Sequence, residues 1–371
     1  MKKFDKDRLL LGIAGPALAL VSAFLLTMLV LAATGVNPIE PLRIMVENAG
    51  YEDIQVLIVN QAGTYYLAAL AVAIGFRMNL FNIGVDGQYR LAAMVSAVVG
   101  AAVTLPGPLH ILLIVAVAML TGAFWAGIAG VLKAKRGVSE VVSTIMLNAI
   151  ATSLIAWLIL PKNLGVQPPG SNDLTTGDIA ESGWFPAVDM GDSGQIYGFT
   201  FVAFALGIVY WFVLNRTRFG FDLRATGASE SAAQASGVDA KRMILTSMLI
   251  SGAVAGLAGM PILLGESHTY SLNFPLGVGF TGITIALLGR NSPVGIFFAA
   301  LLIAFIDKAS AGLDTAGYAK EIGTIMKGLI VIAVVVSYEL VRRYGIRRQQ
   351  QKVGEELAAG HAIKTDKEVA A

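Results

Sequence analysis

The sequence predicts an all-α, polytopic membrane protein with about eight full transmembrane helices plus a re-entrant or short helix pair. Hydrophobic residues make up 56% of the 371 residues and charged residues only 14%, whereas soluble domains average about 25% charged residues. Several long stretches also contain no charged residue. About 20 helical residues are enough to cross a bilayer with every backbone polar group paired.

The apolar stretches divide into predicted spans wherever Gly, Pro or charged residues interrupt them. The spans cover residues 9–33, 54–76, 91–132 (split in two by TLPGP at 104–108), 141–160, 199–214, 243–264 and 322–340. The first span follows the basic start MKKFDKDR, as the apolar core of a signal peptide would. It is longer than the roughly 7–15 residues of such a core, so we expect it to be the first transmembrane helix and not a cleaved signal peptide. The run 269–306 is interrupted by RNSP at 290–293, so its two short pieces are expected to start and finish on one side of the membrane.

Charge placement predicts the orientation and the division of the chain. With both termini in the cytoplasm, most of the 27 Lys and Arg residues fall on the inner side, as the positive-inside rule requires. The predicted parts are a cytoplasmic N-terminus (1–8), a transmembrane domain (9–341) and a flexible cytoplasmic tail (342–371). Within the domain, loops 34–53 and 161–198 are expected outside the cell and loop 215–242 in the cytoplasm.

The residues that usually carry catalysis are scarce. The three His residues occur in no metal-binding spacing, there is no Cys, and neither GxSxG nor the phosphate-binding motif GxxxxGK[ST] is present. The sequence therefore predicts no catalytic residue, metal, cofactor or nucleic-acid partner. Any energy from ATP would have to come from another subunit.

Loop 215–242 contains a predicted helix of about two turns. Ser229 is a suitable N-cap and Gly237 a suitable residue to follow the helix end, which brackets a helix over residues 230–236. Alanines give this helix a smooth face. Two interpretations stay open from the residues alone: a helix that sits in a groove of a partner protein, or a solvated linker.

Five segments indicate a family. LFNIGVDGQ (80–88), GVSEVVSTIMLN (137–148), TRFGFDLRATGASESAAQASGV (217–238), SGAVAGLAG (251–259) and GFTGITIALLGRNSPVG (279–295) lie in order along the chain. They resemble the permease subunits of ABC importers for nucleosides and simple sugars, a group related to the ribose and branched-chain amino acid permeases. The resemblance covers residues 55–340, and the outer loop 161–198 carries little of it.

The resemblance implies a multi-pass permease of the bacterial plasma (inner) membrane that is not itself an enzyme. It also implies ABC ATPase subunits, a second permease subunit, homologous or identical, and an extracytoplasmic substrate-binding protein as partners. The helix of loop 215–242 resembles the coupling helix that docks on the ATPase. The residues expected to couple the two proteins are Arg224, Gly227, Ser229, Glu230, Ala232, Ala233 and Gly237.

Two glycine-interrupted segments are candidates for the substrate path. Paired interruptions of this kind in the two halves of a transporter indicate a binding site, and neutral amides and hydroxyls suit a nucleoside or sugar. The alternative is that these side chains satisfy loop backbone and helix ends. The residues concerned are Asn79, Asn82, Asp86 and Gln88 in the first segment and Thr281, Thr284 and Asn291 in the second.

An ion-coupled secondary transporter is the main alternative function. It would need a buried acid in the membrane, and the acids nearest to the spans are Asp86 and Glu140. Both are expected to form ion pairs at the membrane border, Asp86 with Arg90 and Glu140 with Arg136. A membrane enzyme or a channel has no supporting motif.

Overall fold

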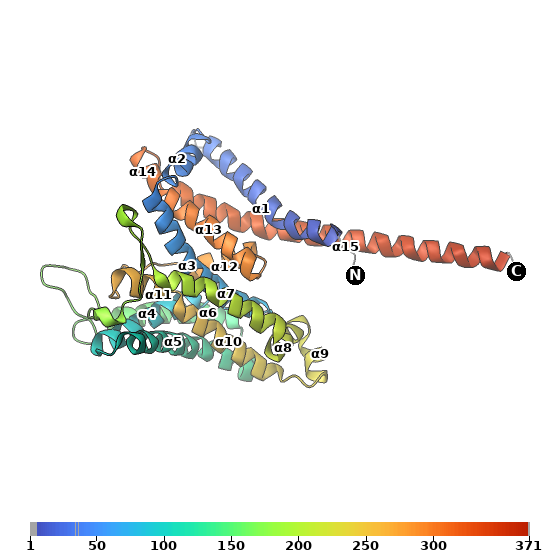
Figure 1. Cartoon of the computed structure of the whole chain (residues 1–371). Helices are drawn as coiled ribbons and strands as arrows, with labels where there is room; N and C mark the ends of the chain where they lie inside the picture. Colours follow the sequence, from blue (N-terminus) through green and yellow to red (C-terminus); the bar gives the residue numbers. More distant parts are fainter. Residues whose placement is uncertain (1–5, 34, 36, 370–371) are drawn as a thin grey trace. The chain divides into compact units, whose positions relative to one another are not determined.

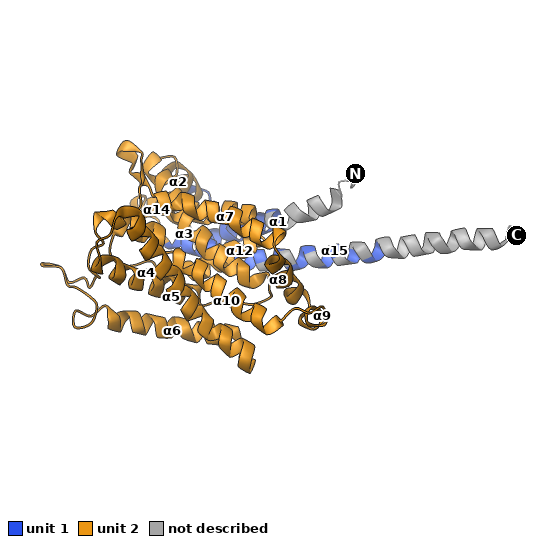
Figure 2. Cartoon of the chain, turned by 60° about the horizontal axis from the view of Figure 1, so that its bottom comes forward, with its two compact units in different colours: residues 1–41, 321–371 blue, residues 42–320 orange. Residues whose placement is uncertain are grey.

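The computed structural model describes residues 6–33, 35 and 37–369, and it contains two compact units. The larger unit is Leu42–Lys320, and the smaller unit joins the two ends of the chain, Met1–Pro41 and Glu321–Ala371 (Figure 2). Part of the predicted N-terminal segment, residues 1–5, lies outside the described residues.

The described part of the chain is mainly helical, which confirms the predicted fold class. Seven of its helices are long and apolar enough to cross a membrane, namely Glu52–Phe76, Gly107–Arg136, Glu140–Leu158, Gly198–Arg216, Ala240–Ser267, Pro293–Thr315 and Glu321–Gly345. Two predicted spans are not among the seven. The span 9–33 lies within the helix Lys6–Ala33, whose side chains the structure describes only from Ala17 on, and the span that begins at residue 91 belongs to a helix with buried polar residues near its start.

The larger unit holds most of the elements (Figure 1). They are α2 (Glu40–Asn48, from Leu42 on), α3 (Glu52–Phe76), α4 (Val85–Ala102), α5 (Gly107–Arg136), α6 (Glu140–Leu158), α7 (Gly198–Arg216), α8 (Arg218–Ala228), α9 (Glu230–Ala235), α10 (Ala240–Leu257), α11 (Met260–Ile262), the π-helix η3 (Leu263–Ser267), α12 (Val278–Leu288), α13 (Pro293–Ala309) and α14 (Ala311–Thr315). Between α6 and α7 lie two 3₁₀ turns, η1 (Glu181–Gly183) and η2 (Gly191–Ser193), and an antiparallel pair of short strands, β1 (Val188–Asp189) and β2 (Gln195–Ile196).

The smaller unit consists of α1 (Lys6–Ala33) and α15 (Glu321–Val369), which pack together. The hydroxyls of Ser22 and Ser337 lie 3.4 Å apart in this contact. Helix α15 continues beyond its apolar part, so the tail predicted after residue 341 is helical as far as it is described.

Helices α4 and α12 both begin inside the bundle and not at its ends. The segment 77–84 folds back between α3 and α10, where Asn82 donates to the Ser251 hydroxyl and Ser251 donates to the carbonyl of Ala71. The first turn of α12 meets the first turn of α4, because the Gly279 N–H donates to the Asp86 carboxylate at 3.2 Å. Irregular backbone at membrane depth is stable only when protein covers it in this way.

The second piece of the run 269–306 is longer than predicted. Helix α12 has only 11 residues, but α13 and α14 together form an apolar stretch, Pro293–Thr315, that is long enough to cross a membrane. The prediction ended this piece before Asp307. In the structure the helix continues past Asp307, whose carboxylate accepts a hydrogen bond from the Tyr65 hydroxyl of α3.

Glu140 pairs with a different base from the one predicted. Its carboxylate lies 3.0 Å from the ammonium of Lys133, and not beside Arg136. Gly137 ends α5 in the left-handed conformation, which turns the chain back toward the preceding helical turn. The predicted partner, Arg136, was therefore wrong, because the base that pairs with Glu140 lies about one helical turn earlier.

Small residues allow α5 and α10 to approach closely. A Cβ added to Gly252 would collide with the carbonyl oxygen of Gly122, and one added to Gly256 would collide with that of Ala118. This is the close backbone contact that small residues provide at membrane helix interfaces.

Replacing Gly256 tests this contact. Gly256→Ala is expected to destabilise the larger unit by about 1–3 kcal/mol, because overpacking forces the two helices apart. The melting temperature of the purified chain in detergent is the measurement. Gly328→Ala is the control, because a Cβ there meets nothing within 4 Å; equal melting temperatures for the two variants would contradict the prediction.

Candidate coupling surface and substrate path

Helices α8 and α9 lie at one end of the larger unit, and the long loop between α6 and α7 lies at the other (Figure 1). We call these the α9 end and the loop end. The two ends carry different features, and the predicted site residues divide between the α9 end and the interior of the bundle.

Helix α8 fixes the α9 end to the bundle. Its N-cap Thr217 accepts a hydrogen bond from the Gly220 N–H, which satisfies one of the free donors of the first turn. The Arg224 guanidinium donates to the Leu214 carbonyl near the end of α7. Gly227 packs so tightly on the turn after α3 that an added Cβ would lie 2.5 Å from the carbonyl oxygen of Arg77. Arg224 and Gly227 therefore position the loop.

Helix α9 forms where its end signals predict it. The Ser229 hydroxyl accepts from the Ala232 N–H at 3.3 Å. At the other end, Gly237 has a φ of +84°. The Val238 N–H donates to the Ala233 carbonyl at 3.0 Å, so the helix closes with a Schellman motif.

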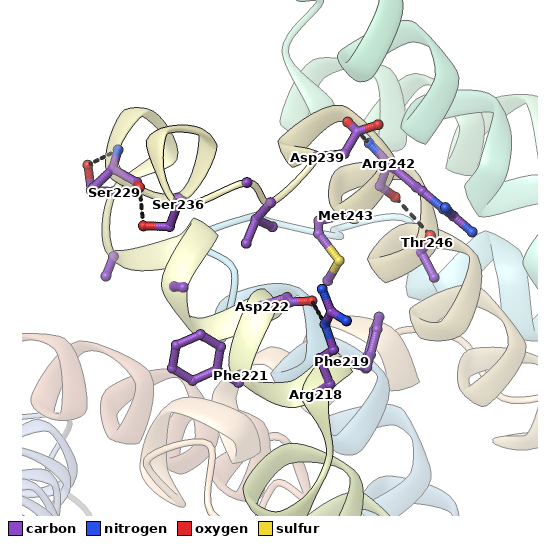
Figure 3. A pocket seen from close by; sticks show the side chains of 16 residues that line it. Arg218, Phe219, Phe221, Asp222, Ser229, Ser236, Asp239, Arg242, Met243 and Thr246 are labelled. Carbon is purple, nitrogen blue, oxygen red and sulfur yellow. Dashed lines mark hydrogen bonds and ion pairs between the residues drawn. The ribbon is translucent and has the colours of Figure 1, made fainter.

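The predicted coupling residues of α9 divide by exposure. Ser229, Glu230, Ala232 and Gly237 are exposed, whereas Ala233 is 3% exposed and faces the bundle. A groove of about 960 Å³ runs between α8, α9 and the start of α10 (Figure 3). Phe221, which sequence reasoning did not select, lines this groove and is 61% exposed.

The rim of the groove carries charges of both signs. The Arg218 guanidinium lies 3.8 Å from the Asp222 carboxylate. On the opposite rim, Asp239 caps α10 by accepting from the Arg242 N–H at 3.0 Å (Figure 3). An exposed aromatic side chain between charged rims has the composition of a protein-binding surface.

Three of the predicted substrate-path residues hold the helix break before α4 in place. Asn82 and Gln88 exchange two hydrogen bonds at 2.8 and 2.9 Å, and both are buried. Asn82 also accepts from the Gly84 N–H. Asp86 accepts from the first turn of α12, where a negative charge is favoured by the helix dipole.

The residues Asn79 and Asn291 occupy turns near the α9 end. Both have positive φ angles, 58° and 53°, which Asn tolerates better than most residues. The carbonyl of Asn291 accepts from the Arg77 guanidinium at 2.8 Å and from the Tyr210 hydroxyl at 3.0 Å. Thr284 is buried, and its hydroxyl points to the Phe280 carbonyl of its own helix.

Thr281 belongs to a polar cluster that sequence reasoning missed. The Tyr65 hydroxyl, which donates to Asp307, also lies beside the side chains of Gln61 and Thr281. The cluster joins α3, α12 and α13. The spacing of Gln61 and Tyr65, four residues apart on α3, was the one sequence signal, because it places both on the same helix face.

Two cavities lie at the loop end of the larger unit. One of about 300 Å³ includes Gln61 of the polar cluster, and one of about 690 Å³ extends under the loop between α6 and α7. They share Leu57, Asn60, Tyr197 and Glu266 in their walls. Burial, together with the neighbouring Glu266 carboxylate, raises the pKa of the Tyr197 hydroxyl, so that hydroxyl is protonated and can donate.

Two of these shared residues are held firmly. The Asn60 side chain donates to the Gln195 carbonyl and accepts from the Tyr197 N–H, at 2.8 and 2.9 Å. Tyr197 in turn packs against Gly265 of η3. A π-helix turn such as η3 often marks a functional site. Among the described residues, no three His, Asp or Glu side chains gather as a metal ion would require.

Comparison with known proteins places the chain in a family. Residues 54–335 match the model described as branched-chain amino acid transport system / permease component. A guanosine ABC transporter permease protein of Bacillus subtilis is 36% identical over 292 residues, which cover 76% of this chain and 81% of the relative.

Two further relatives match over most of their length. A nucleoside ABC transporter permease protein of Lactococcus lactis is 31% identical, with 87% of this chain and 90% of the relative covered. A glucose ABC transporter permease protein of Haloferax volcanii is 29% identical, with 89% of each chain covered. On the extent of the family match and these identities, the chain belongs to the family of branched-chain amino acid transport system permease components.

Proposed function

We propose that this chain is the transmembrane permease subunit of a binding-protein-dependent ABC importer that moves nucleosides, or a related simple sugar, into the cytoplasm. The relatives are named as guanosine, nucleoside and glucose ABC transporter permeases. The observation that carries the proposal is the exposed, doubly capped helix α9 beside a groove of about 960 Å³. The chain has no phosphate-binding motif of its own, so we assign ATP hydrolysis to separate ATPase subunits.

The contacts of α8 suggest how force from an ATPase would reach the bundle. Gly227 packs on Arg77 at the end of α3, and the Arg77 guanidinium donates to the Asn291 carbonyl between α12 and α13. Arg224 adds a bond to the end of α7. A displacement of α9 would therefore act on four helices together, which favours rigid-body rocking over local bending.

The polar cluster offers a substrate path between the same helices. We propose that Gln61, Tyr65 and Thr281 contact the substrate, since uncharged hydrogen-bonding groups suit a neutral nucleoside or sugar. In this proposal Asn82, Asp86 and Gln88 hold the helix break that borders the path. Thr284 follows Thr281 along α12, and Asn79 and Asn291 lie where the path would open at the α9 end.

The orientation and the other partners belong to the same proposal. The α9 end would face the cytoplasm together with both chain termini, and the loops 34–53 and 161–198 would face a substrate-binding protein outside. A second permease subunit, homologous or identical, would complete the membrane part. The divisions 1–8, 9–341 and 342–371 follow from this orientation.

One observation favours a second candidate, an ion-coupled secondary transporter. Asp307 is an acid inside an apolar stretch long enough to span a membrane, and it is bonded to Tyr65. Acids at membrane depth are frequent proton or ion carriers. The capped surface helix α9 has no role in such a mechanism, so we place this candidate second.

Charge reversal on α9 tests the docking role. Glu230→Lys is expected to reduce ATP-driven uptake roughly tenfold or more, because a like or unpaired charge in an interface costs several kcal/mol. The measurement is substrate uptake into proteoliposomes that contain the chain with its ATPase and binding protein. Glu321→Lys, the same change at an exposed position outside α9 and outside the loops 34–53 and 161–198, is the control; equal losses in both variants would contradict the prediction.

The left-handed turn after α9 offers a separate test. Gly237→Val is expected to distort the helix end, because a left-handed conformation costs a residue with a Cβ about 1–2 kcal/mol. Space alone is not limiting, since an added Cβ meets nothing within 4 Å. Gly237→Val is expected to hydrolyse ATP without substrate uptake, whereas Gly237→Asn is expected to keep ATP hydrolysis coupled to uptake. Full coupling in both variants would contradict this prediction.

A protonophore distinguishes the two candidate functions. With ATP held constant, uptake by the reconstituted transporter is expected to persist when the proton gradient is removed, because the energy comes from the ATPase. Asp307→Asn is expected to lower the uptake rate without making it sensitive to the protonophore. Uptake that collapses with the gradient would support the secondary transporter.

A further inference from the structure

The larger cavity at the loop end contains a rigid aromatic surface. The indole of Trp184 stacks on the imidazole of His268, with ring centroids 3.8 Å apart and planes 11° from parallel. Its N–H donates to the Ile179 carbonyl at 2.9 Å. Trp184 nevertheless remains 40% exposed on the cavity wall, so one ring face is covered by His268 and the residue is still accessible.

The backbone around Trp184 is anchored to the end of the π-helix. The Ile179 N–H donates to the His268 carbonyl and the Phe185 N–H donates to the Leu264 carbonyl, both at 2.9 Å. His268 has a φ of 51°, a left-handed turn that brings its ring back under the indole. Burial lowers the pKa of the His268 imidazole, which favours its neutral form.

The same cavity contains a carboxylate and a phenol. Glu266 is exposed in its wall, two residues before His268, and its carboxylate lies beside the Tyr197 hydroxyl. A carboxylate in such a place accepts hydrogen bonds from sugar hydroxyls, as acidic residues do with the ribose 2′-hydroxyl in dinucleotide sites. The cavity of about 690 Å³ is within the usual size of a small-molecule site.

We propose that this cavity is a ribonucleoside-binding site of the permease itself, in which the nucleobase stacks on Trp184 and the ribose diol hydrogen-bonds to Glu266. The aromatic surface favours a nucleoside over a free ribose, because the π face of a base stacks more strongly on an indole than the C–H bonds of a ribose do. The carboxylate favours ribose over deoxyribose, because only ribose presents both adjacent hydroxyls. The proposed function supplies the identity of the cargo, and the inference rests on it in that respect.

The position of the site fits an entry point to the path. Glu266 and Tyr197 are also part of the wall of the cavity of about 300 Å³, and Gln61 in that wall lies beside Tyr65. A ligand released at Trp184 would therefore meet a continuous series of polar groups toward Thr281. Trp184 comes from the loop 161–198, so this loop would contribute to the selectivity of the site.

Binding to the full chain in lipid nanodiscs tests the proposal, with adenosine, 2′-deoxyadenosine and ribose as probes in equilibrium dialysis. The native chain is expected to bind adenosine more tightly than 2′-deoxyadenosine and ribose.

Trp184→Leu is expected to weaken adenosine binding roughly tenfold or more, with Trp184→Phe close to native because stacking is kept. Glu266→Gln is expected to remove most of the preference for adenosine over 2′-deoxyadenosine. Trp157→Leu and Glu181→Gln, outside the cavity, are the controls.

The outcomes separate this inference from the proposed function. Two results would overturn the inference even if ATP-driven uptake is intact. One is native-like adenosine binding in both Trp184→Leu and Glu266→Gln, and the other is no adenosine binding by the folded native chain. If adenosine binding depends on Trp184 but the assembled transporter shows no ATP-driven uptake, the binding site is supported and the proposed function is contradicted. Elution of each variant as the native species in size-exclusion chromatography shows that it is folded.

Discussion

The need to pair every backbone polar group inside a membrane governs this structure. Two segments leave the helical conformation, at residues 77–84 and 269–277, and a buried side chain anchors each of them, Asn82 in the first and Tyr270 in the second. Asn82, Gln88 and Ser251 bond the first segment, and Asp86 bonds the helix start that follows the second. The polar residues in these apolar surroundings therefore have a structural task before any functional one.

The same requirement brings the functional elements together. Because the two helix breaks meet at Asp86 and Gly279, α3, α4 and α12 lie against one another, and α13 joins them through Tyr65 and Asp307. At the α9 end, Arg77 is the common contact of α8 and the turn between α12 and α13. The breaks thus create both a polar interior and a mechanical connection from that interior to the surface helix α9.

Local signals in the sequence were sufficient for some features and not for others. The helical class, the break at TLPGP and the two ends of α9 follow from composition, Pro and capping residues, which act within a few positions. The bond between Tyr65 and Asp307 joins residues 242 positions apart, and no local pattern predicts it. The Glu140 partner was missed because a left-handed Gly137 redirects the chain, and α8 was missed because its main anchors, Leu214 and Arg77, lie outside it.

The most direct measurement for the central claim is the protection of α9 by an ATPase. The chain contains no Cys, so Ala232→Cys introduces a single thiol on the exposed face of α9, and Asp192→Cys introduces one at an exposed position of the loop end. The rate of maleimide labelling is compared with and without the ATPase subunit. Docking of α9 on the ATPase predicts slow labelling of Ala232→Cys only in the complex, with the labelling of Asp192→Cys unchanged. Equal labelling of Ala232→Cys in both states would contradict it.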